Sequence, residues 1–504
     1  MSSAWVMAWW QLRAARGGHY AGAGTGSALP AHAVVSISVV RVNALAERGG
    51  STAPPPAVLA LLHPTGRPHR VRVLGSGLAG VDEQDPAGAG DLLVLAPRGR
   101  ECDDDALRAM AATAVEAAGA GALVLVVAPR RARRTLRRHL DDAGVGAREP
   151  AFLTSRRGAV VAAERAALER LAWASTALGR VALRVAGARP ALAARLGSRT
   201  VVVHGPGTVA GWLGPDGSRR PSAVALVPAS RGEGGTVLVS GAVEGEGVLV
   251  AKVRLGDSGE LAEREARALE AFGAGARATG VDVPVVIRVV NVGAGRAPVL
   301  RHIAGTPAAR ESRTALETAE RLAGWLARWT AATRATDEGR AILERELVEP
   351  LEALAGELPP AWIADVRRRV AASTAGPVPV AAVHGDLTLW NVLRAPDGLA
   401  VVDWEEARLA LPLLDLPYLI VDAVVSRERG ADRIAAYQAC FRDGGNHAAW
   451  ARSLVVRTAA DVPAPWLELV FDACWLGHAA DERRRGLVDG PFLGVLRSHA
   501  RGRG

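Results

Sequence analysis

VPVAAVHGDLTLWNVLRAPDGLAVVDWEEA, from Val378 to Ala407, carries the strongest structural signal in the chain. Its apolar runs, rich in valine and leucine, alternate with polar clusters and a Pro-Asp-Gly turn. This order predicts strand, polar loop, strand, turn and strand. Four chemically active side chains, His384, Asp386, Asn391 and Asp403, then fall on loops or strand ends. The buried strands would hold these side chains in fixed positions.

The spacing H-G-D-x-x-x-x-N, followed by two apolar residues and D-W-E, resembles the catalytic and metal-binding loops of the aminoglycoside phosphotransferase and choline kinase group. These proteins are relatives of the protein kinases. The resemblance implies a two-lobed protein-kinase-like fold and transfer of a phosphoryl group from ATP, with Mg²⁺, to an alcohol. Gly385 stands where protein kinases have arginine, and Trp404-Glu405 stands where they have Phe-Gly. Both departures favour a small-molecule acceptor over a protein.

The resemblance assigns a role to each polar residue. Asp386 would orient the acceptor hydroxyl and take its proton. Asn391 and Asp403 offer the hard oxygen ligands that Mg²⁺ prefers. His384 is expected to brace the loop backbone, and a general-base histidine is the alternative. Asp415 is expected to be structural, and Glu405 is left open as a metal-adjacent carboxylate.

Lys252 is the only lysine in a chain that carries 61 lysines and arginines. It lies within a strand-like run, GVLVAKVRL (247–255), and the next segment, 260–272, has helical periodicity. Glu265 falls on the apolar stripe of that helix, where a buried carboxylate needs a cation. The kinase resemblance makes Lys252 and Glu265 a phosphate-positioning pair and places Val250 over the adenine. Chance survival of the lysine and a purely structural ion pair are the alternatives.

The other segments expected of a two-lobed kinase-like fold occur in the expected order along the chain. Residues 283–308 predict two strands and a linker at 302–305, and residues 314–335 predict a long amphipathic helix. Residues 229–237 are the candidate nucleotide-covering loop, although they lack a G-x-G-x-x-G pattern. The resemblance covers the chain from about residue 223 onward.

The N-terminal half shows a different alternation of predicted strands and helices. Three apolar runs, 70–77, 91–97 and 121–129, predict buried strands, and 104–119 and 130–144 predict helices. This alternation predicts a parallel sheet and an α/β, Rossmann-like domain. Residues 75–80 spell G-x-G-x-x-G, but no helix follows to bind a pyrophosphate, so a dinucleotide site is disfavoured. Residues 91–163 weakly resemble a class I methyltransferase-like domain without its methyl-donor motif.

The expected organisation therefore has five parts. Residues 1–30 form an N-terminal segment, expected to be poorly ordered, and 31–165 the Rossmann-like domain. Residues 166–220 form a helical connection and linker, 221–301 the small lobe and 302–504 the large lobe.

The composition limits the classes of molecule that the protein is expected to bind. The formal net charge is +9, but the arginines are scattered and no nucleic-acid motif accompanies them. A solvated arginine-rich face is the expectation, and a peripheral contact with an anionic surface is the alternative. The three cysteines show no metal spacing or disulfide framework. No apolar run has membrane-spanning length, so a cytoplasmic location is expected.

The favoured function is an ATP- and Mg²⁺-dependent kinase for a small-molecule hydroxyl. The acceptor would be a sugar, an aminoglycoside-like compound, a choline-like alcohol or a glycan intermediate. The alternative is an inactive, nucleotide-binding scaffold whose N-terminal domain binds a partner. The acceptor and the oligomeric state are not encoded in any motif.

Overall fold

The computed structural model describes residues 71–74, 92–96, 99–128, 130–145, 149–155, 158–162, 199–204, 210–214, 221–228, 236–254, 260–292, 295–337, 339–374, 376–429 and 431–501. It divides into two compact units, one of Met1–Glu263 with Val286–Ala304 and the other of Arg264–Val285 with Gly305–Gly504. The predicted N-terminal segment 1–30, the glycine motif at 75–80 and most of the candidate covering loop, 229–235, lie outside the described residues.

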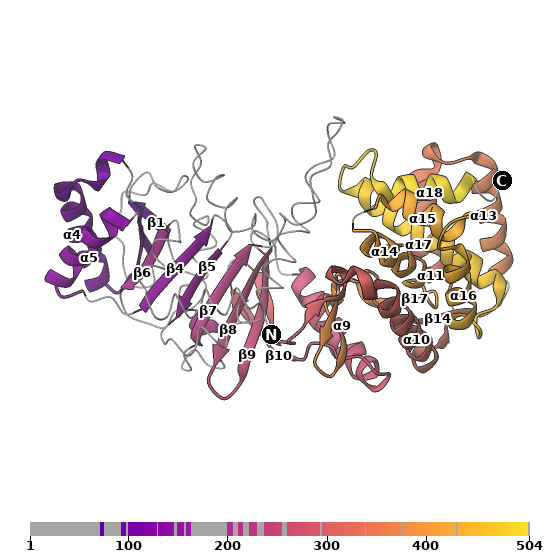
Figure 1. Cartoon of the computed structure of the whole chain (residues 1–504), viewed down its shortest axis with the longest axis horizontal. Helices are drawn as coiled ribbons and strands as arrows, with labels where there is room; N and C mark the ends of the chain where they lie inside the picture. Colours follow the sequence, from indigo (N-terminus) through magenta and orange to yellow (C-terminus); the bar gives the residue numbers. More distant parts are fainter. Residues whose placement is uncertain are drawn as a thin grey trace. The chain divides into compact units, whose positions relative to one another are not determined.

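Among the described residues of the first unit, 11 strands form one sheet in the order β1-β2-β3-β6-β4-β5-β7-β8-β9-β11-β10 (Figure 1). The strands are β1 (Val71–Leu74), β2 (Leu92–Leu95), β3 (Leu123–Ala128), β4 (Glu149–Ser155), β5 (Gly158–Ala162), β6 (Arg199–His204), β7 (Pro221–Pro228), β8 (Thr236–Val243), β9 (Gly247–Arg254), β10 (Val286–Val292) and β11 (Gly295–Arg301). β1, β2 and β3 are parallel, and every later pairing is antiparallel.

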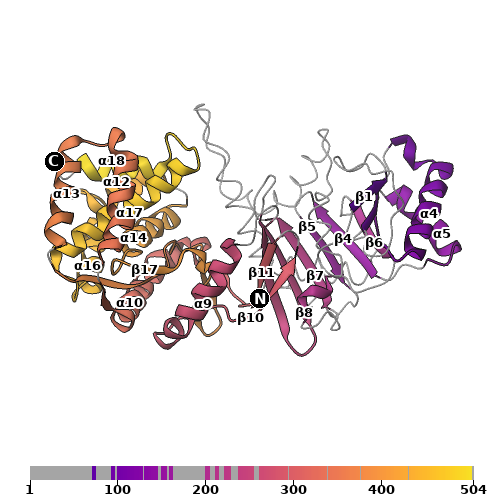
Figure 2. The same ribbon diagram turned by 180° about the vertical axis from the view of Figure 1, so that it is seen from behind.

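Two helices cover the β1 end of this sheet. α4 (Asp104–Gly119) and α5 (Arg130–Asp142) contact each other, and both pack against β3 (Figure 2). Their alanine and leucine faces close over β2 and β3 around Leu95, Leu107, Val124 and Leu136. Asp103 caps α4 by accepting the main-chain N–H of Ala106. These strands and helices are those that the N-terminal sequence predicts.

The structure differs from the predicted domain boundary between residues 165 and 221. β6 lies inside the stretch predicted as a helical connection, and it pairs with β3 and β4. Trp212 and Leu213 in the same stretch are buried. β5 then pairs with β7, so the sheet continues from the N-terminal half into the region predicted as a small lobe. A separate Rossmann-like domain over 31–165 stays a prediction.

The second unit is mainly helical, with two three-stranded sheets in the orders β12-β15-β16 and β13-β14-β17. Its strands are β12 (Thr306–Pro307), β13 (Ala335–Asp337), β14 (Val378–Val383), β15 (Val392–Ala395), β16 (Gly398–Val401) and β17 (Arg408–Ala410). Its helices are most of α9 (Glu260–Ala278), then α10 (Ala315–Thr333), α11 (Arg340–Leu343), α12 (Glu349–Leu354), α13 (Pro360–Ser373), α14 (Leu416–Arg427), α15 (Arg433–Phe441), α16 (Ala448–Thr458), α17 (Ala464–Arg484) and α18 (Pro491–Arg501).

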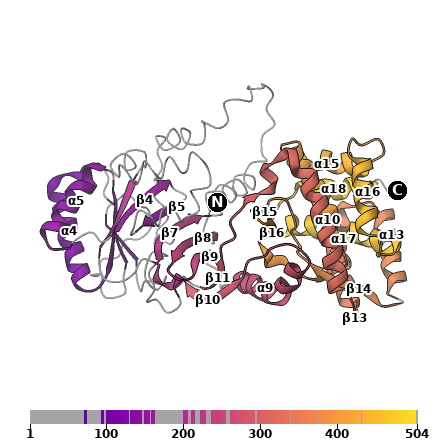
Figure 3. The same cartoon turned by 60° about the horizontal axis from the view of Figure 1, so that its bottom comes forward.

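Helix α10 links the helical core to the strands that carry the polar loops. It packs against α14, α16 and β14 (Figure 3). Its Trp329 stacks on Trp325 at 4.9 Å and meets the edge of Trp404 at 5.5 Å. All three rings are almost completely buried. The loop after β16 is therefore anchored by aromatic packing. Among the helices that the structure describes, none is long and apolar enough to cross a membrane.

Candidate active site

The loop after β14 presents His384, Gly385 and Asp386 in a geometry that depends on the carboxylate of Asp415. The two oxygens of Asp415 accept the main-chain N–H groups of His384 at 2.7 Å and of Gly385 at 2.8 Å. Burial raises the pKa of Asp415, while His384, these two amides and Arg408 act in the opposite direction. Asp415 precedes α14, so the first turn of that helix fixes the loop.

Gly385 occupies a position that no other residue could fill without strain. Its φ is +82°, and an added Cβ would lie 2.5 Å from the main-chain oxygen of Glu406. The left-handed conformation alone disfavours other residues, and the close approach of the chain after β16 excludes a side chain. The glycine that distinguishes this loop from that of protein kinases is thus required by local packing.

His384 is completely buried, and the hydrogen bonds of its ring are to main-chain groups. Its Nε2 lies 3.1 Å from the carbonyl oxygen of Val402, and its Nδ1 accepts the N–H of Asp386 at 3.4 Å. The ring also meets the edge of Trp404 at 5.1 Å. These contacts tie the loop after β14 to the end of β16 and leave neither ring nitrogen directed at a reactant.

Asn391 joins the two ends of the loop. Its Nδ2 donates to the carbonyl oxygen of Asp386 at 2.7 Å and to the carboxylate of Asp386 at 3.1 Å. Its Oδ1 is buried and has no hydrogen-bond partner among the described residues. A buried acceptor without a partner costs about 1–3 kcal/mol. Such an atom is suited to a ligand or cation.

Asp403 follows β16 in a left-handed conformation, with φ 71° and ψ 58°. Aspartate tolerates this region better than most residues do, but the conformation is uncommon for residues other than glycine. One carboxylate oxygen from each of Asp403, Glu405 and Glu265 lies within 4.8 Å of the other two. Glu265 also accepts the N–H of Trp404 at 3.4 Å. Three close carboxylates repel one another unless cations neutralise them, and their oxygens suit a hard divalent ion.

The structure therefore brings together seven of the nine predicted site residues within the second unit. These are Glu265, His384, Asp386, Asn391, Asp403, Glu405 and Asp415. Lys252 and Val250 lie on β9 of the first unit. Lys252 is buried and faces Leu238 of β8, and Val250 faces Ser240 of β8 and Leu300 of β11. The pairing of Lys252 with Glu265 stays a prediction.

Asp422 is a further loop-positioning residue, which the sequence motif does not include. It is buried in α14, and its carboxylate accepts the N–H of Leu389, between Asp386 and Asn391, at 2.8 Å. Asp415 and Asp422 are seven residues apart, which places both on one face of a helix. In the sequence, the signal for this role is an acidic residue seven positions after Asp415 in an otherwise apolar helical segment.

Comparison with known proteins supports a phosphotransferase in this region. Residues 227–452 match the model of the phosphotransferase enzyme family, while a search of curated proteins finds no match. The match begins at residue 227, so the methyltransferase-like resemblance of 91–163 has no support from it.

Several solved structures resemble the chain over slightly more than half its length. A choline/ethanolamine kinase family protein from Mesorhizobium loti is 21% identical, with 55% of this chain and 87% of that chain covered and a TM-score of 0.32. A glucosamine kinase in complex with glucosamine, ADP and inorganic phosphate is 20% identical, with 53% and 73% covered and a TM-score of 0.35. An aminoglycoside 2'-phosphotransferase in its GDP complex is 14% identical, with 54% and 91% covered and a TM-score of 0.34.

The family match and the polar loops agree on the position of the site, because Asp386, Asn391 and Asp403 all fall inside the matched residues. Residues 227–452 of this chain are matched by the model of the phosphotransferase enzyme family.

Proposed function

We propose that the C-terminal region transfers the γ-phosphoryl group of ATP to a hydroxyl group of a small molecule, with Asp386 as the catalytic base. The acceptor would be a sugar, an aminoglycoside-like compound, a choline-like alcohol or a glycan intermediate. The family match supports the reaction class. The arrangement of the polar loops supports the roles of individual residues.

The observation that carries this proposal is the environment of Asn391. Its NH₂ group is used by Asp386, and its buried oxygen has no hydrogen-bond partner among the described residues. A buried amide oxygen kept in this state is best explained by a ligand that the folded chain is built to accept. Mg²⁺ prefers such oxygens and retains some of its waters.

Asp403 and Asn391 would hold the cation, with Glu405 beside it. When bound, Mg²⁺ would neutralise charge on the phosphates of the nucleotide. The residues fit this role because Asp403, Glu405 and Glu265 already form a cluster of oxygen ligands. Asn391 would then serve two ends of the site, orienting Asp386 through its nitrogen and the cation through its oxygen.

Asp386 has the position and partners of a base. It is partly exposed, while its main chain is held by His384 and Asn391. Its carboxylate would accept the proton of the acceptor hydroxyl as the oxygen–phosphorus bond forms and the bond to ADP breaks. The hydrogen bond from Asn391 keeps the carboxylate oriented during this transfer.

Lys252 would bind the α- and β-phosphates, with Glu265 keeping its ammonium in place and Val250 covering the adenine. A lysine is suited to this role because its compact ammonium acts as a point charge between oxygens, whereas a guanidinium is a broad planar fork. The strand position of Lys252 and Val250, two residues apart in β9, puts both side chains on one face of the sheet.

A screen of alcohol acceptors with Mg-ATP tests this function directly. ADP release that depends on the acceptor, together with a phosphorylated product identified by mass spectrometry, is the expected result. Asp386→Asn should abolish that release, and Asp397→Asn, in the exposed turn between β15 and β16, should not. Nucleotide binding without turnover of any acceptor would instead identify a nucleotide-binding scaffold.

A further inference from the structure

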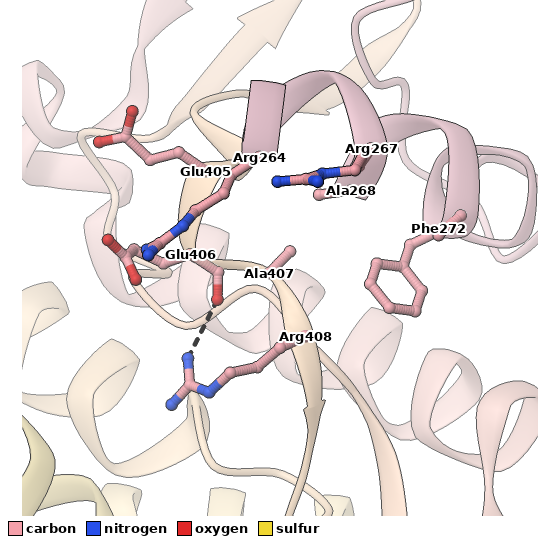
Figure 4. A pocket seen from close by; sticks show the side chains of 9 residues that line it. Arg264, Arg267, Ala268, Phe272, Glu405, Glu406, Ala407 and Arg408 are labelled. Carbon is pink, nitrogen blue, oxygen red and sulfur yellow. Dashed lines mark hydrogen bonds between the residues drawn. The ribbon is translucent and has the colours of Figure 1, made fainter. Parts of the chain in front are cut away.

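We propose that a cavity between α9 and the segment Glu405–Arg408 binds a small organic anion that regulates the neighbouring acid cluster. The cavity has a volume of about 400 Å³ and is lined entirely by residues of the second unit (Figure 4). That volume lies within the range of sites that hold small molecules. The binding does not depend on the proposed function, but the regulatory consequence rests on the cation site that the proposed function includes.

One wall of the cavity is a face of α9. Arg264, Arg267, Ala268, Ala271 and Phe272 line it, and their spacing of three and four residues places them on the same side of the helix. Phe272 and the two alanines give this wall an apolar surface. Ala407 extends the apolar surface on the opposite wall.

The arginines that line the cavity differ in their hydrogen bonds and ion pairs. Arg408 makes two hydrogen bonds to the buried carboxylate of Glu346, at 2.9 and 2.8 Å, and a third to the main-chain oxygen of Glu406. Arg264 and Arg267 are exposed on α9, and neither forms an ion pair within 4 Å in the described part of the chain. Figure 4 shows Arg264 reaching from the helix toward Glu406.

Arg264 and Arg267 carry positive charge on the α9 wall, and Glu405 and Glu406 line the opposite wall, where burial raises the pKa of Glu406 and Arg264 acts to lower it. The two guanidinium groups beside the apolar side chains define the chemistry of the ligand. Guanidinium groups bind carboxylates and phosphates through paired hydrogen bonds. The apolar wall of Phe272 and the alanines needs a hydrophobic body to cover it. The ligand class is therefore a phosphate monoester or carboxylate with an aromatic or aliphatic body, and a bare inorganic anion would leave half of the cavity unused.

The position of the cavity links it to the acid cluster. Arg264 is adjacent in sequence to Glu265, and the opposite wall includes Glu405, so both walls carry a residue of the cluster. A ligand that contacts both walls would favour the arrangement in which Glu265, Asp403 and Glu405 lie close together. Binding of the anion should therefore tighten the binding of a divalent cation, by about fivefold or more for a typical coupling between sites.

The binding test uses the full-length protein and phenyl phosphate, with benzoate, benzyl alcohol and inorganic phosphate as comparison compounds, measured by isothermal titration calorimetry. Phenyl phosphate or benzoate should bind most tightly, because each combines an anion with a ring. The double variant Arg264→Gln/Arg267→Gln should weaken this binding about tenfold or more. Ala271→Trp, at an exposed position of the helix, should fill the cavity and have the same effect.

The matched control is Arg277→Gln, which removes an exposed arginine of α9 that does not line the cavity. This variant should bind the probe as tightly as the original protein. Equal binding to the double variant would overturn the site, because it would place the probe elsewhere, including at a nucleotide site. Equal affinity for benzyl alcohol, or no binding of any anion, would also overturn it.

The regulatory effect is measured as a change in the affinity of the protein for a divalent cation. Mn²⁺ titrations followed by electron paramagnetic resonance should show about fivefold tighter binding when phenyl phosphate saturates the cavity. The Arg264→Gln/Arg267→Gln variant should lose this response but keep its basal Mn²⁺ affinity. Unchanged Mn²⁺ affinity would overturn the coupling. A protein that shows this response but transfers phosphate to no acceptor would contradict the proposed function and leave the site standing.

Discussion

In the proposed function, Asn391 would organise both the base, Asp386, and the cation. The nitrogen of its side-chain amide donates to Asp386, and the amide oxygen is buried without a hydrogen-bond partner among the described residues. The sequence predicted that Asp386 and Asn391 belong to one loop, because their spacing is part of the motif. It did not predict that the amide nitrogen bonds to the carboxylate, since such contacts depend on loop conformation.

Lys252 provides a residue-specific test of the proposed nucleotide site, since the chain contains no other lysine. An ATP-derived acyl phosphate that reacts with amines should label Lys252, and excess ATP should protect it. Lys252→Arg should lower turnover about a hundredfold or more, although the charge is kept. Peptide mass spectrometry and steady-state kinetics measure the two effects. Normal turnover by the arginine variant would refute the assigned role.

At the scale of elements, α14 holds the loop between β14 and β15 at two points. Asp415 binds the main chain of His384 and Gly385, and Asp422 binds that of Leu389. Asp415 could be assigned from the motif. Asp422 could not, because its partner is a main-chain group 33 residues away and a sequence pattern contains no such pairing.

Replacement of Asp422 by alanine tests this role of α14. Asp422→Ala leaves the buried N–H of Leu389 without its partner, so the free energy of unfolding should fall by about 1–3 kcal/mol. Turnover should fall as well, because the loop carries Asp386. Asp422→Asn keeps an acceptor oxygen and should lose less of both. Urea unfolding followed by tryptophan fluorescence is the measurement, and equal effects of the two variants would contradict the hydrogen-bonding role.

The packing between α14, α17 and α18 makes stability depend on pH. His478 of α17 stacks on Phe492 at 4.6 Å, and burial together with nearby Arg433 lowers its pKa to about 3. In the unfolded chain its pKa returns to about 6.5. The unfolded chain therefore binds more protons between these values. The stability contribution is complete above about pH 6.5 and is lost as the pH falls toward 3.

His478→Phe keeps an aromatic ring on Phe492 but cannot be protonated. Its free energy of unfolding should depend less steeply on pH between 4 and 6.5 than that of the original protein, by up to about 1.4 kcal/mol per pH unit. Denaturant unfolding at several pH values measures this slope. The same slope in both proteins would show that His478 is not the titrating group.

At the scale of the whole molecule, the sheet of the first unit extends beyond the boundary that composition predicted. The strands and helices around 92–142 and 236–301 were predicted in the right order, because each has its own apolar periodicity. The sequence did not predict the pairing of β5 with β7, because an apolar run shows that a strand is buried but not which strand lies beside it. The small-lobe strands thus share a sheet with the N-terminal half.

A truncated chain tests this continuity. A protein that starts at residue 210 would lose β5 and leave the main chain of β7 as an open sheet edge. Exposed edges pair with other chains. The truncated protein should form larger species than the full chain at equal concentration, as measured by light scattering after size-exclusion chromatography. A truncated protein with the size distribution and stability of the full chain would show that the predicted boundary at 220 is a true domain boundary.

The central claim is that Asp386 is the base of a small-molecule kinase. Its most direct test is the turnover number for transfer from Mg-ATP to an identified acceptor, measured for the original protein, Asp386→Asn and Asp397→Asn. Loss of the base should reduce turnover about 10²–10⁴-fold, while Asp397→Asn should change it little. Turnover by Asp386→Asn within a few fold of the original protein would contradict the claim.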